Sequence, residues 1–121
     1  MNYGINHYSD ENQLLNKEYT SDLVSGKLLV NTPLYLLIDT KTRSAAAFFF
    51  YTLQSFEKAG IMSQSGAGGA HRNSFYTLNE NFSISISIAA PINPKMNTNW
   101  ENEGVIPDSM ETNDPITALI N

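Results

Sequence analysis

The residue best placed for nucleophilic chemistry is Ser44, which lies between two apolar segments. Residues 33–39, Pro-Leu-Tyr-Leu-Leu-Ile-Asp, predict a strand buried on both faces, as in a parallel sheet. Residues 44–60 predict an Ala-rich helix with Lys58 in its last turn and Gly60 after its end. A serine at this junction lies at the positive end of the helix dipole, where backbone N–H groups stabilise negative charge. Hydrolases use such strand–nucleophile–helix junctions, and an ordinary serine N-cap is the alternative interpretation.

Two further residues are candidates for catalysis. His71 follows a glycine-rich loop at residues 65–70 and is either a base or an ordinary surface histidine. Glu101 follows Trp100 and is either a functional acid or an exposed loop acid. The loop lacks the Gly-Lys-Ser/Thr ending of a phosphate-binding motif. Two distant histidines and scattered acids give no metal-ligand spacing, so the sequence predicts no metal and no cofactor.

The rest of the chain predicts the elements that position these residues. Residues 61–64 are expected to form a second parallel strand after the helix, and this alternation favours an α/β fold. Residues 75–78 and 82–88 predict a hairpin, since Phe82, Ile84, Ile86 and Ile88 alternate with serines.

The two ends of the chain and one internal segment are more polar. Residues 91–108 are expected to be a long loop, and residues 113–120 to begin a helix. Residues 1–20 form a polar lead-in with a short helical turn near residues 12–18, ahead of a single domain at residues 21–121.

Composition excludes several function classes. The chain has 121 residues, a formal net charge of −5 and no cysteine. The scarcity of basic residues argues against nucleic acid as a partner, and the absence of cysteine excludes a thiol nucleophile. The most apolar run, residues 45–51, is far shorter than the roughly 20 residues that cross a membrane. No export signal is visible at the N-terminus, and the compartment stays open.

The motifs together resemble the C-terminal processing (tail-specific) serine peptidase superfamily, in the branch related to interphotoreceptor retinoid-binding protein. The resemblance covers roughly residues 20–120. It rests on several short motifs in the family's order, at residues 33–38 (PLYLLI), 42–46 (TRSAA), 68–71 (GGAH), 92–94 (INP), 98–101 (TNWE) and 104–108 (GVIPD).

The resemblance implies a ClpP/crotonase-like core of stacked ββα units. It also implies that Ser44 is the nucleophile, that Glu101 orients the serine machinery and that His71 assists. The backbone N–H groups implied near the oxyanion are those of Ser44, Ala45, Gly68 and Gly69.

The sequence also departs from the family pattern. The lysine position of the serine–lysine branch falls on Gly69, the usual acid after the nucleophile is Ala47, and the usual aromatic before it is Arg43. The family's N-terminal region, which helps to form the oxyanion hole, has no counterpart here. The resemblance therefore implies the C-terminal part of a catalytic domain, truncated on its N-terminal side. Family members are often exported or periplasmic.

Two functions remain open from the sequence. The first is a serine-type peptidase acting on peptide or protein substrates, completed by a missing N-terminal half or by a second copy in a homo-oligomer. The second is a catalytically inactive peptidase-like module that binds peptides or apolar ligands or serves assembly.

Overall fold

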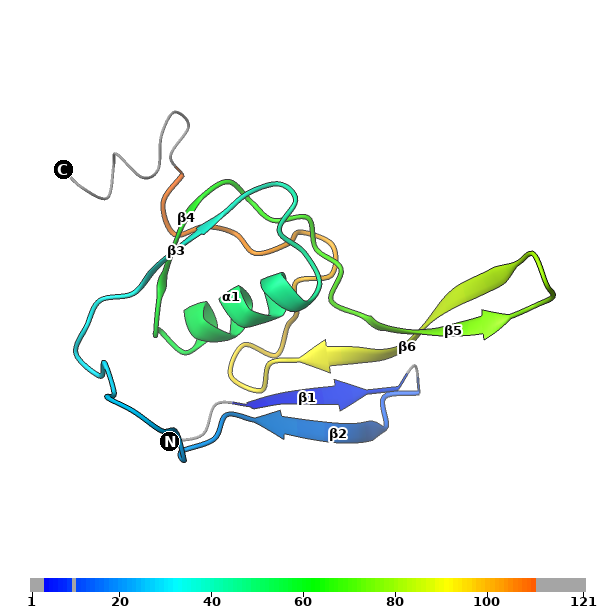
Figure 1. Cartoon of the computed structure of the whole chain (residues 1–121), viewed down its shortest axis with the longest axis horizontal. Helices are drawn as coiled ribbons and strands as arrows, with labels where there is room; N and C mark the ends of the chain where they lie inside the picture. Colours follow the sequence, from blue (N-terminus) through cyan, green and yellow to red (C-terminus); the bar gives the residue numbers. More distant parts are fainter. Residues whose placement is uncertain (1–3, 10, 111–121) are drawn as a thin grey trace.

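The computed structural model describes residues 4–9 and 11–110, which form one helix and two sheets (Figure 1). A four-stranded antiparallel sheet has the order β2-β1-β6-β5, and β3 pairs with β4 in a parallel two-stranded sheet. The elements, in chain order, are β1 (Gly4–Tyr8), β2 (Leu14–Tyr19), β3 (Tyr35–Ile38), α1 (Ala45–Ser55), β4 (Gly60–Ser63), β5 (Arg72–Thr77) and β6 (Ser83–Ile92).

The predicted strand–helix–strand unit is confirmed. β3 and β4 run parallel in a register that pairs Tyr35 with Gly60 and Ile38 with Ser63, and α1 connects them. α1 lies between this pair and the four-stranded sheet (Figure 1). The main core lies on the β3–β4 side of the helix and consists of Ile38, Ala47, Ile61, Trp100 and Val105.

The prediction that β3 is buried on both faces is wrong. Tyr35 is 56% exposed and Leu37 is 37% exposed, whereas Ile38 is buried. The helix and the core cover one face of the β3–β4 pair, so alternate side chains of the strand stay exposed on the other face.

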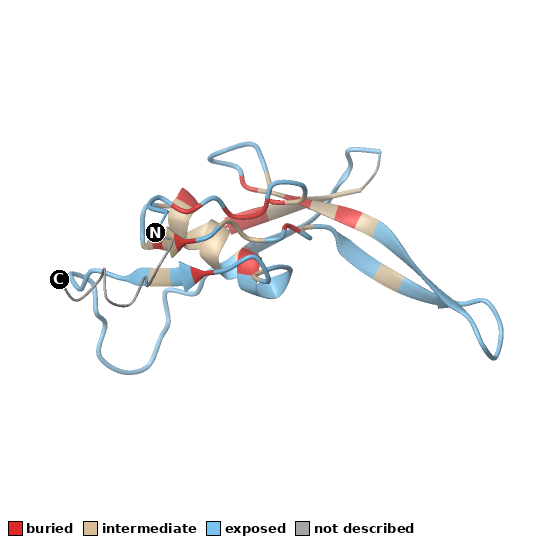
Figure 2. Ribbon diagram, turned by 90° about the horizontal axis from the view of Figure 1, so that it is seen from above, coloured by how far each residue is buried: buried red, intermediate tan, exposed pale blue. Residues whose placement is uncertain are grey.

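The predicted hairpin is confirmed and is longer than expected. Figures 1 and 2 show β5 and β6 projecting from the body of the molecule, with their far ends exposed. The apolar face of β6 is therefore largely uncovered, since Ile84 and Ile86 are 42% and 45% exposed and Phe82, just before the strand, is 66% exposed. β6 also includes Pro91 and Ile92, which were expected in a loop, because they pair with β1.

The predicted helical turn near residues 12–18 is wrong. β1 and β2 form an antiparallel hairpin there, and β1 pairs on its other side with β6. Tertiary pairing with β6 fixes the extended conformation of a segment whose own pattern is weak. The helix expected at residues 113–120 lies outside the described residues. None of the helices in the described ranges is long and apolar enough to cross a membrane.

Candidate active site

Ser44 lies at the sharp turn where the chain passes from β3 into α1. Its backbone has φ 54° and ψ −127°, a conformation that non-glycine residues rarely adopt and that costs on the order of 1–3 kcal/mol. Ser44 is exposed, and its hydroxyl makes no capping hydrogen bond to the helix. These features disfavour an ordinary N-cap and match a serine whose hydroxyl is presented to solvent at a strained strand-to-helix turn.

The turn before Ser44 is held by Asp39. One Asp39 carboxylate oxygen accepts hydrogen bonds from the Lys41 backbone N–H (2.9 Å) and the Thr42 hydroxyl (3.2 Å). The Thr42 N–H donates to the Asp39 carbonyl (3.0 Å). The Lys41 N–H, followed by the Thr42 groups, lowers the pKa of Asp39 because these donors favour the ionised form. Asp39 was not among the residues predicted to form the site, although its spacing from Thr42 is typical of an Asx turn.

The first backbone amides of α1 are open. Phe48 N–H donates to the Ser44 carbonyl (2.9 Å), which is the usual helical bond. Ala45 and Ala46 lie before Phe48 in the first turn, and neither of their N–H groups donates to another group of the described chain. Both alanines are exposed beside Ser44, so their amides are available to a negatively charged oxygen at the helix N-terminus.

The segment at residues 68–71 runs alongside Ser44. Arg43 and Gly68 form a parallel bridge, and the Ser44 N–H donates to the Gly68 carbonyl (3.3 Å). The Gly69 N–H donates to the Glu101 carbonyl (3.1 Å). The amides of Ser44 and Gly69 thus already donate within the fold, unlike that of Ala45.

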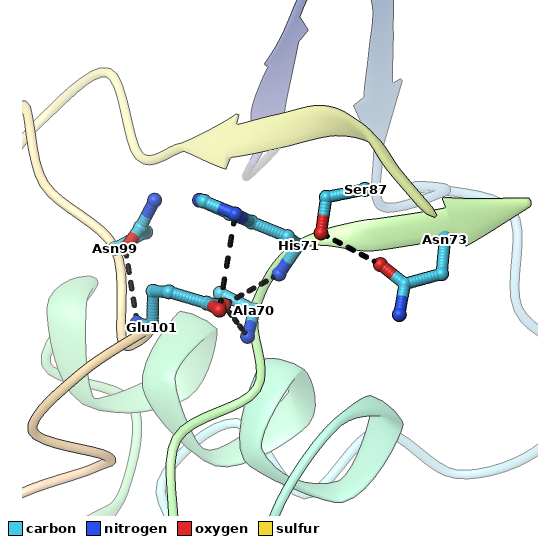
Figure 3. A network of polar contacts seen from close by, with 6 residues as sticks. All are labelled: Ala70, His71, Asn73, Ser87, Asn99 and Glu101. Carbon is cyan, nitrogen blue, oxygen red and sulfur yellow. Dashed lines mark hydrogen bonds and ion pairs between the residues drawn. The ribbon is translucent and has the colours of Figure 1, made fainter. Parts of the chain in front are cut away.

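Glu101 holds this segment in place (Figure 3). Its Oε2 accepts hydrogen bonds from the backbone N–H groups of Ala70 (2.5 Å) and His71 (2.8 Å). Its Oε1 lies 3.8 Å from His71 Nδ1, an ion-pair distance for a protonated imidazole. The Glu101 N–H donates in turn to Asn99 Oδ1 (3.0 Å), a role that was not predicted for Asn99 although it lies within the TNWE motif.

Glycines allow the backbone of residues 66–69 to pack directly against residues 101–104. A Cβ atom at Gly68 would overlap the Glu101 carbonyl oxygen, and one at Gly104 would overlap the Gly66 carbonyl oxygen. Both Gly68 and Gly104 also have positive φ. The glycine-rich loop therefore has a structural explanation in close backbone packing.

The structure brings His71 and Glu101 into contact and places the backbone of Ser44 beside Gly68. Within the described ranges, no hydrogen bond joins the Ser44 hydroxyl to His71 or Glu101. A cavity of about 960 Å³ lies at the other end of α1, against the 92–108 segment, and Ser44 is not among its lining residues.

Comparisons with known proteins place these features in a family. The model of peptidase family S41 matches residues 2–110. A search of curated protein sequences finds no significant match.

Three solved structures share the fold at low sequence identity. A photosystem II D1 C-terminal processing protease has a TM-score of 0.75 at 14% identity, covering 92% of this chain and 28% of its own. A lipoprotein from Streptococcus agalactiae has a TM-score of 0.71 at 15% identity, covering 98% of this chain and 43% of its own. A candidate peptidase from Parabacteroides merdae has a TM-score of 0.72 at 18% identity, covering 99% of this chain and 38% of its own. The chain therefore spans less than half the length of each of these structures.

Proposed function

The chain belongs to peptidase family S41, and we propose that it is a serine-type peptidase domain in which Ser44 is the nucleophile. The observation that carries the proposal is the strained backbone of an exposed serine at a helix N-terminus. A φ of 54° at a serine costs conformational energy. Such strained residues concentrate at active sites, where the surrounding structure holds them in place. The fold expected to present this serine is the ClpP/crotonase-like core.

The proposed reaction is acyl transfer. The Ser44 hydroxyl oxygen attacks the carbonyl carbon of the scissile peptide bond while its proton passes to a base. The carbonyl oxygen becomes negatively charged, and the amides of Ala45 and Ala46 donate to it, supported by the helix dipole. Collapse of this intermediate expels the amine, which takes up the proton, and water then hydrolyses the acyl-enzyme by the reverse sequence.

We assign proton transfer to His71 and positioning to Glu101. The carboxylate of Glu101 is engaged by the amides of Ala70 and His71, so its role is to hold this segment next to Ser44. His71 is 35% exposed and its Nδ1 lies 3.8 Å from the Glu101 carboxylate, which orients the imidazole ring. Substitution of a general base lowers rates by about 10²–10⁴-fold.

A second polypeptide surface is part of the proposal. The amides of Ser44 and Gly69 donate hydrogen bonds to carbonyls of the chain, so they are not free to bind the oxyanion. The loss of one oxyanion donor lowers the rate by about 10²–10³-fold. Since the chain spans less than half of the structures it resembles, we propose that an N-terminal peptidase region or a second copy completes the site. The substrates would be peptides or proteins.

A fluorophosphonate probe tests the proposal, because it reacts covalently with an activated serine. We expect slow labelling of the chain at Ser44, mapped by peptide mass spectrometry, and none in Ser44→Ala. His71→Ala should lower the labelling rate by at least tenfold, whereas the control His7→Ala should not. If the folded chain is not labelled at high probe concentration, the proposal fails for this chain and the inactive binding module is favoured.

A further inference from the structure

A second cavity lies between α1 and the β1–β2 hairpin, and one of its walls, Phe48, also packs against the main core. It is half open to solvent, has a volume of about 220 Å³ and is lined by the β1–β2 hairpin and one face of the helix. Its walls are mostly apolar, with Ile5 and Tyr19 from the hairpin and Phe48, Phe49 and Leu53 from the helix.

The helical register connects this cavity to the candidate nucleophile. Residues four apart lie above one another on a helix, separated by about 5.4 Å along its axis. Phe48 and Thr52 therefore lie in the column that starts at Ser44. Phe49 and Leu53 lie in the column that starts at Ala45. Every helical residue that lines the cavity belongs to one of these two columns, so the cavity continues the face on which Ser44 and its open amide lie.

We propose that this cavity is a subsite for a long apolar side chain of a peptide substrate, next to the bond that Ser44 attacks. This inference rests on the proposed function. A bound carbonyl carbon lies close to Ser44, and the cavity begins about one helical turn below it. Leucine, methionine and phenylalanine side chains extend far enough to contact the nearest walls, whereas the alanine methyl group does not.

The polar groups of the cavity narrow the choice of peptide. The Thr52 hydroxyl is buried and has no hydrogen-bond partner among the described residues. An apolar side chain offers it no hydrogen bond, so this hydroxyl adds little to the binding of such a side chain. Glu18 is the one charged residue among those lining the cavity, and its side chain is 49% exposed. Its carboxylate disfavours an acidic residue beside the apolar one and favours a basic neighbour, by a few-fold because the charge is half-exposed.

The test uses peptidyl phosphonate probes that differ only in the side chain next to phosphorus. We expect the full chain to react at Ser44 at least about tenfold faster with the leucine probe than with the alanine probe, since a few methylenes in an apolar pocket give about this discrimination. Thr52→Phe fills the cavity and should abolish the preference. Thr77→Phe, the same substitution on exposed β5, should preserve it. Equal rates with both probes in the unmodified chain would overturn the inference.

A second measurement separates failure of the subsite from failure of the nucleophile. N-acetyl-leucinamide and N-acetyl-alaninamide are titrated into the chain, and the amide NMR signals of α1 and the β1–β2 hairpin are followed. We expect the leucine compound alone to shift the signals of Phe49 and Leu53, also in Ser44→Ala. If it does so while no probe labels Ser44, the subsite stands and the nucleophile proposal fails. Absence of these shifts would overturn the subsite, whatever the labelling shows. Phe49→Ala removes one exposed wall and should also weaken binding, which covers the case in which Thr52→Phe does not fold.

Discussion

Glu101 should stabilise the segment beside Ser44 by an amount that can be measured. Its Oε2 accepts two short hydrogen bonds from backbone N–H groups, and hydrogen bonds to charged groups contribute about 1.5–3 kcal/mol each. Because the side chain is 31% exposed, the lower end of that range applies. We expect Glu101→Ala to lower the free energy of unfolding by about 3 kcal/mol. Glu101→Gln keeps an acceptor oxygen and loses only the charge, so it should cost about 1 kcal/mol.

Urea unfolding followed by circular dichroism measures both values, and amide hydrogen exchange localises them. Protection at Ala70 and His71 should fall in Glu101→Ala. Glu103→Ala removes the same charge from an exposed position on the same loop and supplies the control, with an expected change within about 0.5 kcal/mol. If Glu101→Ala is no more destabilising than Glu103→Ala, or if exchange at Ala70 and His71 is unchanged, Glu101 does not hold this segment.

Three further outcomes follow from local geometry. Gly104→Ala places a methyl group against the Gly66 carbonyl and should either prevent folding or lower the free energy of unfolding in urea by more than about 3 kcal/mol. Gly26 also has positive φ but has open space around it, so Gly26→Ala should lower that free energy by only about 1 kcal/mol. Ser44→Gly should raise the urea midpoint relative to Ser44→Ala, because glycine relieves a strain that alanine retains; an equal midpoint would mean that the turn is unstrained. The pKa of Asp39 is lowered by folding, so its carboxylate stabilises the turn above its ordinary pKa of 3.8 and this contribution is lost as the pH falls through the lower folded value. The difference in melting temperature between the unmodified chain and Asp39→Ala should therefore shrink at acid pH, and a constant difference would contradict the assignment.

The local elements of the fold were predictable where the pattern is strong. The continuous apolar run of β3, the Ala-rich α1 and the alternation in β6 each determine one kind of element. β1 and β2 were missed because their polar sequences have no clear period and β1 depends on pairing with β6, which lies far away in the sequence. The exposure of β6 was also unpredictable, since alternation identifies an apolar face and does not say what covers it.

The positions of the candidate residues in the fold were predictable from the sequence, but the geometry around them was much less so. The position of Ser44 between strand and helix follows from the local pattern, but its φ of 54° does not. The contact between His71 and Glu101 joins two loops that are separated by the whole β5–β6 hairpin, so no local rule indicates it. The loop glycines lack the ending of a phosphate-binding motif, and their packing against residues 101–104 explains them.

A path of hydrogen bonds connects Glu101 to Ser44, the proposed nucleophile, although the two side chains do not contact each other. Glu101 binds the amides of Ala70 and His71 through its side chain, and its carbonyl binds the Gly69 amide. The carbonyl of Gly68, which belongs to the same peptide group as the Gly69 amide, accepts the hydrogen bond from the Ser44 N–H. A strained φ at Ser44 persists only while its surroundings fix it, and this path supplies part of that constraint. Loosening the segment at Glu101 should therefore relax Ser44 toward an ordinary helix start and reduce its reactivity, without removing any group that contacts the substrate.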